Sequence, residues 1–355
     1  MTRVELYDVV IVGGGFAGAA TAFFLARELG GRRVLLVDRE PRPGVHSSGR
    51  NASLVRGPCG DPVQDPLSVE GADFLRRPPE DFPADPRFRR VGSLFVDRED
   101  RLADRLAAGA EFVSMDRVLD SVPAFLPEAG TAALWTADDG VIDKQAVLEG
   151  YLEGAARAGV ELAWGEEVLG IEVEAHRVLG VNTSRRRLRC DRVVLAAGAW
   201  AGLLGETAGS TSRLRPTRRH LAVSGPVAAL DADAPYVWDL NRGFYFRPAE
   251  GGLLMCACDQ TSSEPGDCPA DRQEEQAIAR DFAAVLPSWS VAGLRRCWAG
   301  HRTFADRSDG LWEPDVRVAG LHWAAGLGGF GLTASSAIGR RVAAGLDGVS
   351  VGQPA

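Results

Sequence analysis

The N-terminal part of the chain has the clearest order of apolar and polar segments. Apolar runs at residues 9–12 and 34–37 flank the segment 17–29, and GGGFAG at residues 13–18 directly follows the first run. Short apolar runs of this kind are typical of buried parallel strands, which a crossover helix connects. We therefore predict a strand, a glycine turn, a helix that the glycine pair 30–31 ends, and a second strand.

The glycine turn has the spacing G-x-G-x-x-G. In this pattern Gly13 makes the tight turn, Gly15 lets the backbone approach a pyrophosphate, and Gly18 lets the helix pack closely on the strand. The helix is expected from about Ala17 to Leu29, and its free N–H groups and positive dipole end would point at the phosphates.

Asp38 ends the second strand about twenty residues after the turn, where a carboxylate accepts hydrogen bonds from a ribose 2′-hydroxyl group. The strand, turn, helix, strand and acid in this register predict dinucleotide binding. The alternative is a doubly wound turn of the same kind that holds no nucleotide.

A polar loop, PRPGVHSSGRNAS, follows at residues 41–53 and has no hydrophobic period. Its serines, glycines and basic residues suit an extended part of a ligand, and a solvated connection is the alternative. A second glycine-rich turn, at residues 326–333, precedes the helix expected at the end of the chain.

The apolar pattern changes along the chain. Strands and helices alternate in segments 1–80, 135–213 and 303–355, and Asp143 is expected to cap one of these helices. Segments 81–134 and 214–302 are expected to form a second domain, because much of the latter consists of short runs divided by Gly, Pro and Asn, which favours antiparallel strands. We predict a mixed α/β fold, α+β overall, with a Rossmann-like domain assembled from the discontinuous segments and an antiparallel-sheet substrate domain.

The amino-acid composition excludes several classes of partner and site. A formal net charge of −8 supplies no net basic field that would attract nucleic acid or an anionic membrane. The first apolar segment is neither a signal peptide nor long enough to span a membrane, so we expect a cytoplasmic location. The six cysteines form no pair at metal-binding spacing, so we expect no metal; Cys256 and Cys258 would be reduced thiols on one strand face.

Five motifs in order resemble the D-amino-acid oxidase (DAO) family of FAD-dependent oxidoreductases, which includes glycine oxidase, sarcosine oxidase and bacterial D-arginine dehydrogenase. They are GGGFAG with Asp38, HSSGRNA at residues 46–52, LAAGAW at 195–200, WAGHRTF at 298–304 and GGFGLTAS at 328–335. A nicotinamide enzyme would explain the first motif but not the second or the last.

The resemblance implies that FAD is bound non-covalently, because the cysteine that attaches the flavin in some members is missing near the last motif. Residues 13–18 would hold the pyrophosphate and Val168 the adenine, while residues 47–53 and 328–333 would lie along the flavin. The residues expected to bind FAD are Gly13, Gly15, Phe16, Ala17, Gly18, Asp38, Arg39, Ser47, Ser48, Gly49, Arg50, Asn51, Ala52, Ser53, Leu54, Val168, Ala197, Gly198, Trp200, Gly328, Gly329, Phe330, Gly331, Leu332 and Thr333.

The resemblance also implies that Arg302 grips a substrate carboxylate, assisted by Tyr245. The expected reaction is oxidation of a D-amino acid or an N-substituted glycine-type amine by hydride transfer from carbon to flavin N5. Water would hydrolyse the imine to a 2-oxo acid or an aldehyde plus amine, with oxygen or another compound as the electron acceptor. The alternatives are a 2-hydroxy-acid dehydrogenase and a non-catalytic flavoprotein subunit.

The chain departs from the D-arginine dehydrogenase pattern at Leu54, Arg56 and Cys59, and Ser93 stands where that enzyme has an acid for a cationic side chain. Arg56, Arg218 and Gly329 are the candidate substrate-binding residues. Together with Arg219, the first two arginines raise the hypothesis of a second acidic group on the substrate; solvated surface charges are the alternative. Neither His46 nor His301 is assigned a catalytic role.

Overall fold

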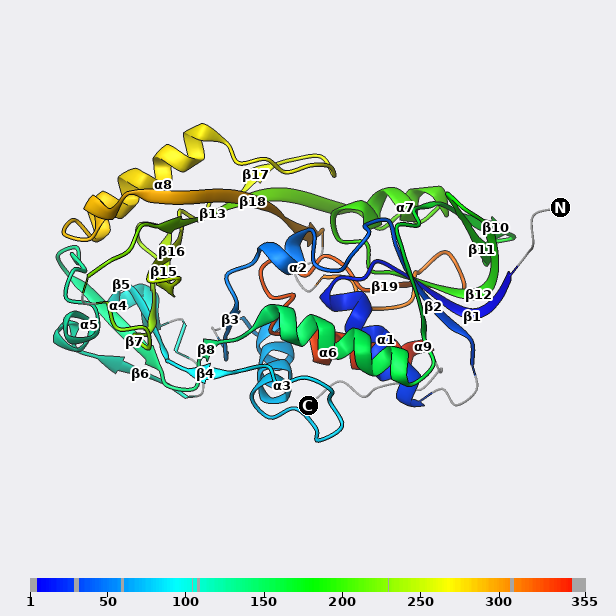
Figure 1. Cartoon of the computed structure of the whole chain (residues 1–355), viewed down its shortest axis with the longest axis horizontal. Coiled ribbons are helices and arrows are strands. Elements are labelled where there is room, and N and C mark those ends of the chain that lie inside the picture. The colour runs from blue at the N-terminus through cyan, green and yellow to red at the C-terminus, as the bar shows by residue number, and fades with distance from the viewer. Residues whose placement is uncertain are drawn as a thin grey trace.

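The computed structural model describes residues 5–28, 32–58, 61–103, 105–106, 109–228, 230–306 and 310–346. The expected end of the first helix at residues 29–31 lies outside these ranges, as does Cys59. The mixed α/β fold is confirmed, because the described residues form two large sheets with helices packed against them (Figure 1).

One sheet is the predicted doubly wound unit. Seven of the described strands form it, in the order β10 (Val168–Glu174), β11 (Arg177–Thr183), β12 (Arg187–Leu195), β1 (Glu5–Val12), β2 (Val34–Asp38) and β9 (Glu161–Trp164), with β19 (Leu321–Trp323) paired to β12. β1 is parallel to β2 and to β12, whereas β10 and β11 extend the sheet in antiparallel fashion. The glycine turn after β1 therefore lies at the carboxyl edge of a parallel sheet, the usual position of a ligand site.

Helices α1 (Phe16–Glu28), α3 (Gln64–Arg76), α6 (Lys144–Arg157) and α9 (Ser335–Leu346) cover or flank this sheet, and α7 (Ala201–Thr207) packs against β10 and β12. Asp143 caps α6 as predicted, because its side chain accepts hydrogen bonds from the backbone of Gln145 and Ala146. α1 and α9 pack closely at Gly339, where a Cβ atom would lie 2.6 Å from the backbone of Ala20. Small residues thus bring the last helix of the chain onto the first.

The second sheet contains nine of the described strands and is mostly antiparallel. Its order is β17 (Thr261–Ser262), β13 (Leu214–Ser224), β16 (Gly252–Cys256), β15 (Phe244–Ala249), β14 (Tyr236–Asp239), β5 (Ser93–Arg98), β7 (Thr131–Thr136) and β6 (Ala110–Val113), with β18 (Leu294–Ala305) paired to β13. Helices α4 (Glu99–Ala103), α5 (Met115–Ser121) and α8 (Arg272–Val285) lie in this half of the molecule (Figure 1).

Two connections join the halves. β13 and β18 pair from Leu214 with Ala305 to Ser224 with Leu294, and this long ribbon runs from one half toward the other (Figure 1). A small sheet of β3 (Leu54–Val55), β8 (Gly140–Val141) and β4 (Arg89–Arg90) lies between them. The strands of the doubly wound sheet all fall inside the predicted first-domain segments, while β7 and β18 cross the predicted boundaries. The exact division into domains stays a prediction.

Two short elements border turns. Within the described part of the charged segment 98–109, a helix covers Glu99–Ala103, and Gly109, with a φ of +92°, precedes strand β6. Strand β19 begins at Leu321. A turn precedes it, because the Oδ1 atom of Asp315 accepts hydrogen bonds from the backbone of Arg317 and Val318.

Candidate functional site

A cavity of about 500 Å³ lies between the two halves and is lined by residues from both large sheets. Its volume is in the range of small-molecule sites. The candidate residues that line it are Gly13, Gly15, Phe16, Ala17, Asp38, Arg39, Ser47, Ser48, Arg50, Asn51, Ala52, Ser53, Leu54, Arg56, Val168, Ala197, Gly198, Trp200, Tyr245, Arg302, Gly328, Gly329, Gly331 and Leu332. The candidates Gly18, Gly49, Arg218, Phe330 and Thr333 are not part of this lining.

The glycine turn between β1 and α1 forms one end of the cavity. Gly13 has a φ of +110°, and a Cβ atom there would lie 2.5 Å from the carbonyl oxygen of Ala196. A Cβ atom on Gly18 would lie 1.9 Å from the oxygen of Gly13, so this glycine serves the close packing of helix on turn. The turn thus brings the N-terminus of α1 to the cavity, where the backbone N–H of Phe16 donates to the Ser48 hydroxyl at 3.0 Å, and a helix N-terminus suits an anion.

Asp38, at the end of β2, faces the same end of the cavity. Its Oδ2 atom accepts a hydrogen bond of 2.7 Å from the backbone of Gly14, and Oδ1 accepts one of 2.8 Å from the backbone of Glu40. Both bonds fix the carboxylate at the position where a ribose would be recognised.

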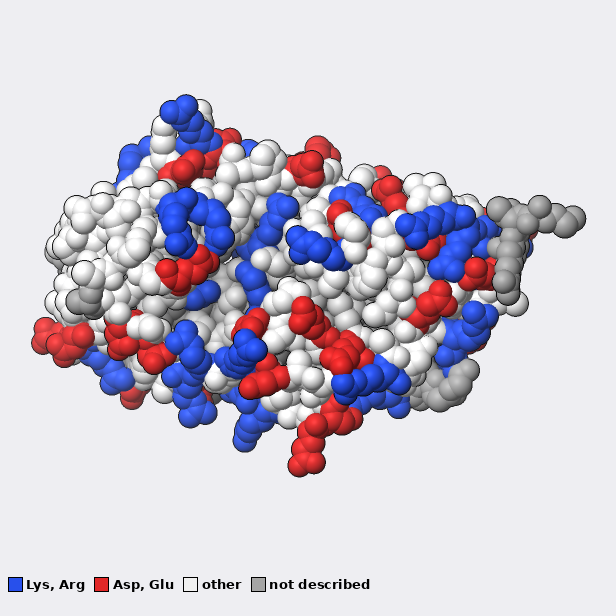
Figure 2. Space-filling view, in the orientation of Figure 1, with Lys and Arg blue, Asp and Glu red and all other residues white. Residues whose placement is uncertain are grey.

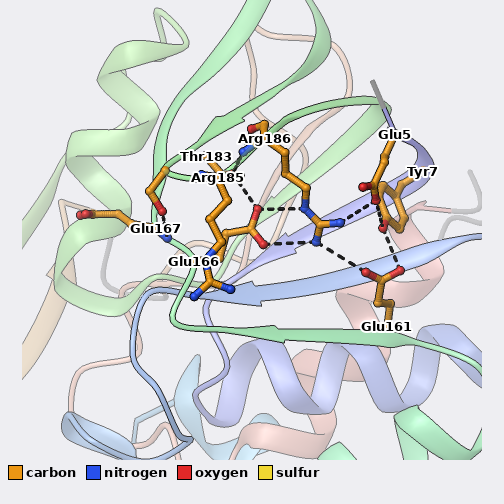
Figure 3. A network of polar contacts seen from close by, with 9 residues as sticks. Glu5, Tyr7, Glu161, Glu166, Glu167, Thr183, Arg185 and Arg186 are labelled. Atoms are coloured by element: carbon orange, nitrogen blue, oxygen red, sulfur yellow. Dashed lines mark hydrogen bonds and ion pairs between the residues drawn. The ribbon is translucent and has the colours of Figure 1, made fainter. Parts of the chain in front are cut away.

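Glu166 and Glu167 continue the wall beside Val168, and a polar network holds Glu166 from behind (Figure 3). Arg186 donates to Glu166 at 3.0 Å and also pairs with Glu5, while Thr183 donates to Glu166 at 2.6 Å. Although burial lowers the pKa of Arg186, the hydrogen bond and charge of Glu166 raise it overall. This network was missed by sequence reasoning, because its members are spread over several separate segments.

Helix α2 (Ser47–Arg50) places the polar loop along the middle of the cavity. The Ser47 hydroxyl donates to the carbonyl oxygen of His301 at 2.6 Å, and Arg50 donates to that of Ala299 at 3.1 Å. The indole N–H of Trp298 in turn donates to the carbonyl oxygen of Arg50 at 2.9 Å. The predicted ligand loop is therefore bonded directly to strand β18.

The glycine-rich segment before α9 lines the cavity beside this loop. The backbone of Gly328 donates to the carbonyl oxygen of Thr303 at 2.8 Å. Behind the lining, the Thr333 hydroxyl donates to the carbonyl oxygen of Leu54 at 3.3 Å and accepts from the backbone of Arg56 at 3.4 Å. Segments from both ends of the sequence thus meet around one cavity, as the motifs predicted.

Arg302 on β18 and Tyr245 on β15 line the part of the cavity formed by the second sheet. Burial, together with the nearby charges of Arg219 and Arg56, lowers the pKa of Arg302 to about 10. Burial raises the pKa of the Tyr245 phenol, which therefore stays neutral at physiological pH. This arrangement offers one cation and one neutral hydrogen-bonding group to a ligand.

The candidate Arg218 needs a correction. It lies outside the lining and 3.8 Å from Asp271, whereas its neighbour Arg219 lines the cavity with Leu221. Successive residues of a strand point to opposite faces, so only one of two adjacent arginines can face the cavity. Arg219, rather than Arg218, is the basic residue that β13 contributes.

His46 and His301 line the cavity, and both rings are held by other groups. His46 Nε2 lies 2.8 Å from a carboxylate oxygen of Glu40. The two ring nitrogens of His301 lie 3.2 Å from the Ser263 hydroxyl and 3.0 Å from the Gly266 carbonyl oxygen. Burial also lowers the pKa of His301.

Within the described ranges, no three or more His, Cys, Asp or Glu side chains gather in a way that could hold a metal ion. No helix in the described part of the chain has both the length and the apolar character needed to cross a membrane.

Comparison with known proteins extends these observations. A family model named DAO and described as FAD dependent oxidoreductase matches residues 8–344. A 4-methylaminobutanoate oxidase (formaldehyde-forming) of Paenarthrobacter nicotinovorans is 29% identical, over 79% of this chain and 34% of that protein, so the chain spans about a third of that relative. A sarcosine oxidase subunit beta of Rhizobium meliloti (strain 1021) is 27% identical, over 83% of this chain and 73% of that subunit.

Among solved structures, an L-proline dehydrogenase from P. horikoshii superposes with a TM-score of 0.86 and 20% identity. The superposition covers 96% of this chain and 93% of that one. A likeness at this level of identity shows that the two chains share a fold.

Proposed function

This chain belongs to the DAO family of FAD-dependent oxidoreductases, as its motifs predicted, and we propose on this basis that it oxidises an amino acid or an N-substituted amino acid. The single observation that carries the proposal is the presence of Arg302 and Tyr245 on the wall of the same cavity as the glycine turn. A carboxylate grip and a dinucleotide site that share one cavity suit an amino acid held against a flavin.

The residues present fit FAD. Gly13 adopts a positive φ that a glycine tolerates without strain, and Gly15 carries no Cβ atom to fill the space beside the Ser48 hydroxyl, where such an atom would lie 2.9 Å from the oxygen. Asp38 would receive the ribose, and the closing segment around Gly328 and Gly329 would border the flavin. No cysteine lies in the closing segment 326–335, which favours non-covalent binding.

Arg302 would bind the substrate carboxylate through two parallel hydrogen bonds, because a guanidinium group matches a carboxylate in shape and charge. Its Nε atom is buried and has no hydrogen-bond partner in the described structure, so the group is available to a ligand. Tyr245 would donate its phenolic proton to the same carboxylate. Two such contacts would fix the carbon that is oxidised, which is catalysis by orientation.

Bound FAD would supply the hydride acceptor. The protein would hold the amine in its neutral form and exclude water from the reacting carbon. Loss of hydride from a neutral amine requires no strong base, which agrees with a cavity where both histidine rings already contact other groups. Hydrolysis of the imine would follow.

The 2-hydroxy-acid alternative has less support, because it needs a base for the hydroxyl proton and both nitrogens of His301 already contact other groups. The alternative of a non-catalytic subunit predicts that no substrate reduces the flavin unless a partner is added. One relative reported above is named as an oxidase of a methylated amine and the other as a subunit of an oxidase. The test therefore covers both an enzyme that acts alone and a subunit that needs a partner.

The test mixes the FAD-loaded protein without oxygen with D- and L-amino acids, N-methyl amino acids and 2-hydroxy acids. We expect an amino acid or N-methyl amino acid to bleach the flavin absorbance without any partner protein. Bleaching by a 2-hydroxy acid alone would replace the proposal with the first alternative. A flavin that no compound bleaches would favour the second.

A further inference from the structure

Three arginines from different elements line the substrate part of the cavity: Arg56 after β3, Arg219 on β13 and Arg302 on β18. Their charges act on one another, because Arg219 and Arg56 both disfavour the protonated form of Arg302. Figure 2 shows Lys and Arg side chains around and within the hollow near the middle of the molecule. One substrate carboxylate would occupy one guanidinium group and leave the other two without a bound carboxylate.

Arg219 is 8% exposed and weakly bonded within the protein. Its two contacts are long, 3.9 Å to the sulfur of Cys256 and 3.5 Å to the amide oxygen of Gln260, and its Nε atom is buried without a hydrogen-bond partner in the described structure. The nearby carboxylate of Asp259 instead accepts hydrogen bonds from the backbone and ring of His220. A buried guanidinium with such weak partners has strong hydrogen-bonding capacity left for an anion.

Cys256 supplies part of the counter-charge. Burial raises the pKa of its thiol, but the hydrogen bond from Cys258 and the charge of Arg219 outweigh burial and lower the pKa overall. Even a full thiolate at Cys256 would carry one negative charge, against three arginines.

Arg56 is also 8% exposed, and its guanidinium group lies against aromatic rings, 5.1 Å from the centre of Trp238 and 4.6 Å from that of Phe330. The charges of Arg56 and Asp139 act on each other. That carboxyl group accepts from the backbone of Gly57 and also bonds Ser93 and Tyr236. Stacking holds the plane of Arg56 without occupying its N–H groups.

Resting on the proposed function, we propose that the substrate carries a second anionic group besides the carboxylate held by Arg302, and that Arg219 and Arg56 receive it. Its chemical class is an amino acid with an acidic side chain or an acidic N-substituent. Such a dianion brings negative charge to three arginines, and Arg302 on one group with Arg219 and Arg56 on the other would fix its orientation. The enzyme would then discriminate strongly against amines with a single carboxylate.

The first test measures binding without turnover. Succinate, malonate, phosphonoacetate, acetate and propionate are titrated into the FAD-loaded protein, and the change of the flavin absorbance gives each dissociation constant. We expect the dianions to bind about tenfold to a hundredfold more tightly than the monoanions, the range of one or two charged hydrogen bonds. The carboxylate and phosphonate ligands distinguish between the two kinds of second anion.

Variants identify the residues that cause the tighter binding of dianions. Arg219→Gln and Arg56→Gln should each remove most of the preference for dianions while acetate binding changes less than about threefold. Arg218→Gln is the matched control, because this adjacent residue lies on the other face of β13 and outside the cavity. Arg219→Lys keeps the charge and provides a second variant if the glutamine variant does not fold.

Reduction of the flavin separates this inference from the proposed function. Iminodiacetate, D-aspartate and D-glutamate are compared with sarcosine, glycine and D-alanine in the absence of oxygen. If the single-carboxylate amines reduce the flavin as efficiently as the others and bind as tightly, the proposed function stands and the second anion site is wrong. Dianions that bind tightly while no amine reduces the flavin would instead contradict the proposed function alone.

Discussion

A Cβ atom on Gly329 would lie 2.2 Å from the Nη2 atom of Arg302, so the guanidinium group occupies space that only a glycine leaves free. The glycine-rich segment before α9 therefore has a task at the substrate end of the cavity as well as at the cofactor. Gly329 is the one residue that the sequence placed in both groups, and this contact gives a physical reason for it.

The contact predicts the effect of Gly329→Ala. The added methyl group should displace the guanidinium group of Arg302 and lower kcat/KM for the amine about tenfold to a hundredfold, as small misplacements of a substrate do. FAD should still bind, which its visible absorbance would report. Gly331→Ala should have a smaller effect on KM, because a Cβ atom there only makes an ordinary contact of 3.6 Å with Leu327.

Replacing Arg302 by lysine tests the carboxylate grip. Lysine keeps the positive charge but loses the two parallel hydrogen bonds, so kcat/KM should fall about a hundredfold while the flavin spectrum is kept. The control is Arg296→Lys on the same strand, where the exposed side chain pairs with Glu250. Equal activities of Arg302→Lys and the wild-type protein would show that this arginine does not hold the substrate.

Arg186→Met tests the network behind Glu166 (Figure 3). Removal of the guanidinium group leaves Glu166, which is 2% exposed, without its cation, so the free energy of unfolding should fall by about 1–3 kcal/mol. FAD should also bind more weakly, because Glu166 and Glu167 form part of the cavity wall. Denaturant titration and FAD titration measure the two effects.

Arg187→Met is the matched control for that variant. Arg187 is the next residue and forms an exposed ion pair with Glu172. Solvent screens such a pair, so its loss should change the stability little. If both variants lose the same stability and affinity, the network has no special role in the cofactor site.

His322 on β19 predicts a dependence of stability on pH. Burial, with a smaller effect of Arg192, lowers its pKa to about 4 in the folded chain, whereas an unfolded histidine titrates at about 6.5. The unfolded state therefore binds more protons between these values. The contribution of neutral His322 to the free energy of unfolding is therefore complete above about pH 6.5. This free energy falls by up to about 3 kcal/mol as the pH falls to about 4.

The measurement is the free energy of unfolding between pH 7 and pH 4.5, for the wild-type protein and for His322→Gln. The variant should lose less stability over this interval. Burial also lowers the pKa of His301, so part of the dependence of the unfolding free energy on pH remains in the variant. Carboxylates with lowered pKa values, such as Asp315, lose their contribution at lower pH and do not interfere. Equal slopes in both proteins would contradict the prediction.

Much of the expected cofactor site could be predicted from the sequence, because its motifs are short and contiguous along the chain. Gly13, Gly15 and Gly18 are read from their spacing, and Asp38 from its distance along the chain; the structure gives the turn and the carboxylate the expected surroundings. Arg302 and Tyr245 came from resemblance alone, since an arginine and a tyrosine on strands have no local signature. Their roles stay proposals.

The other features of the site could not be predicted, because they depend on contacts between segments that are distant in the sequence. The choice between Arg218 and Arg219 is set by the pairing of β13 with β18, where Arg219 lies opposite Gly300. Both faces of β13 are largely buried, so the apolar pattern did not distinguish inward from outward positions. The network of Glu166 and Arg186 likewise joins residues that are ordinary charged side chains when read one at a time.

The hydrogen bonds of Ser47 and Arg50 to the backbone of β18 connect the polar loop to the strand that carries Arg302. A substitution that moves this loop would carry the guanidinium group with it. Weaker retention of the nucleotide and poorer capture of the amine should therefore rise and fall together among variants along this contact. Adaptation to a bulkier substrate would instead have to change lining residues of other strands, such as Trp238 on β14.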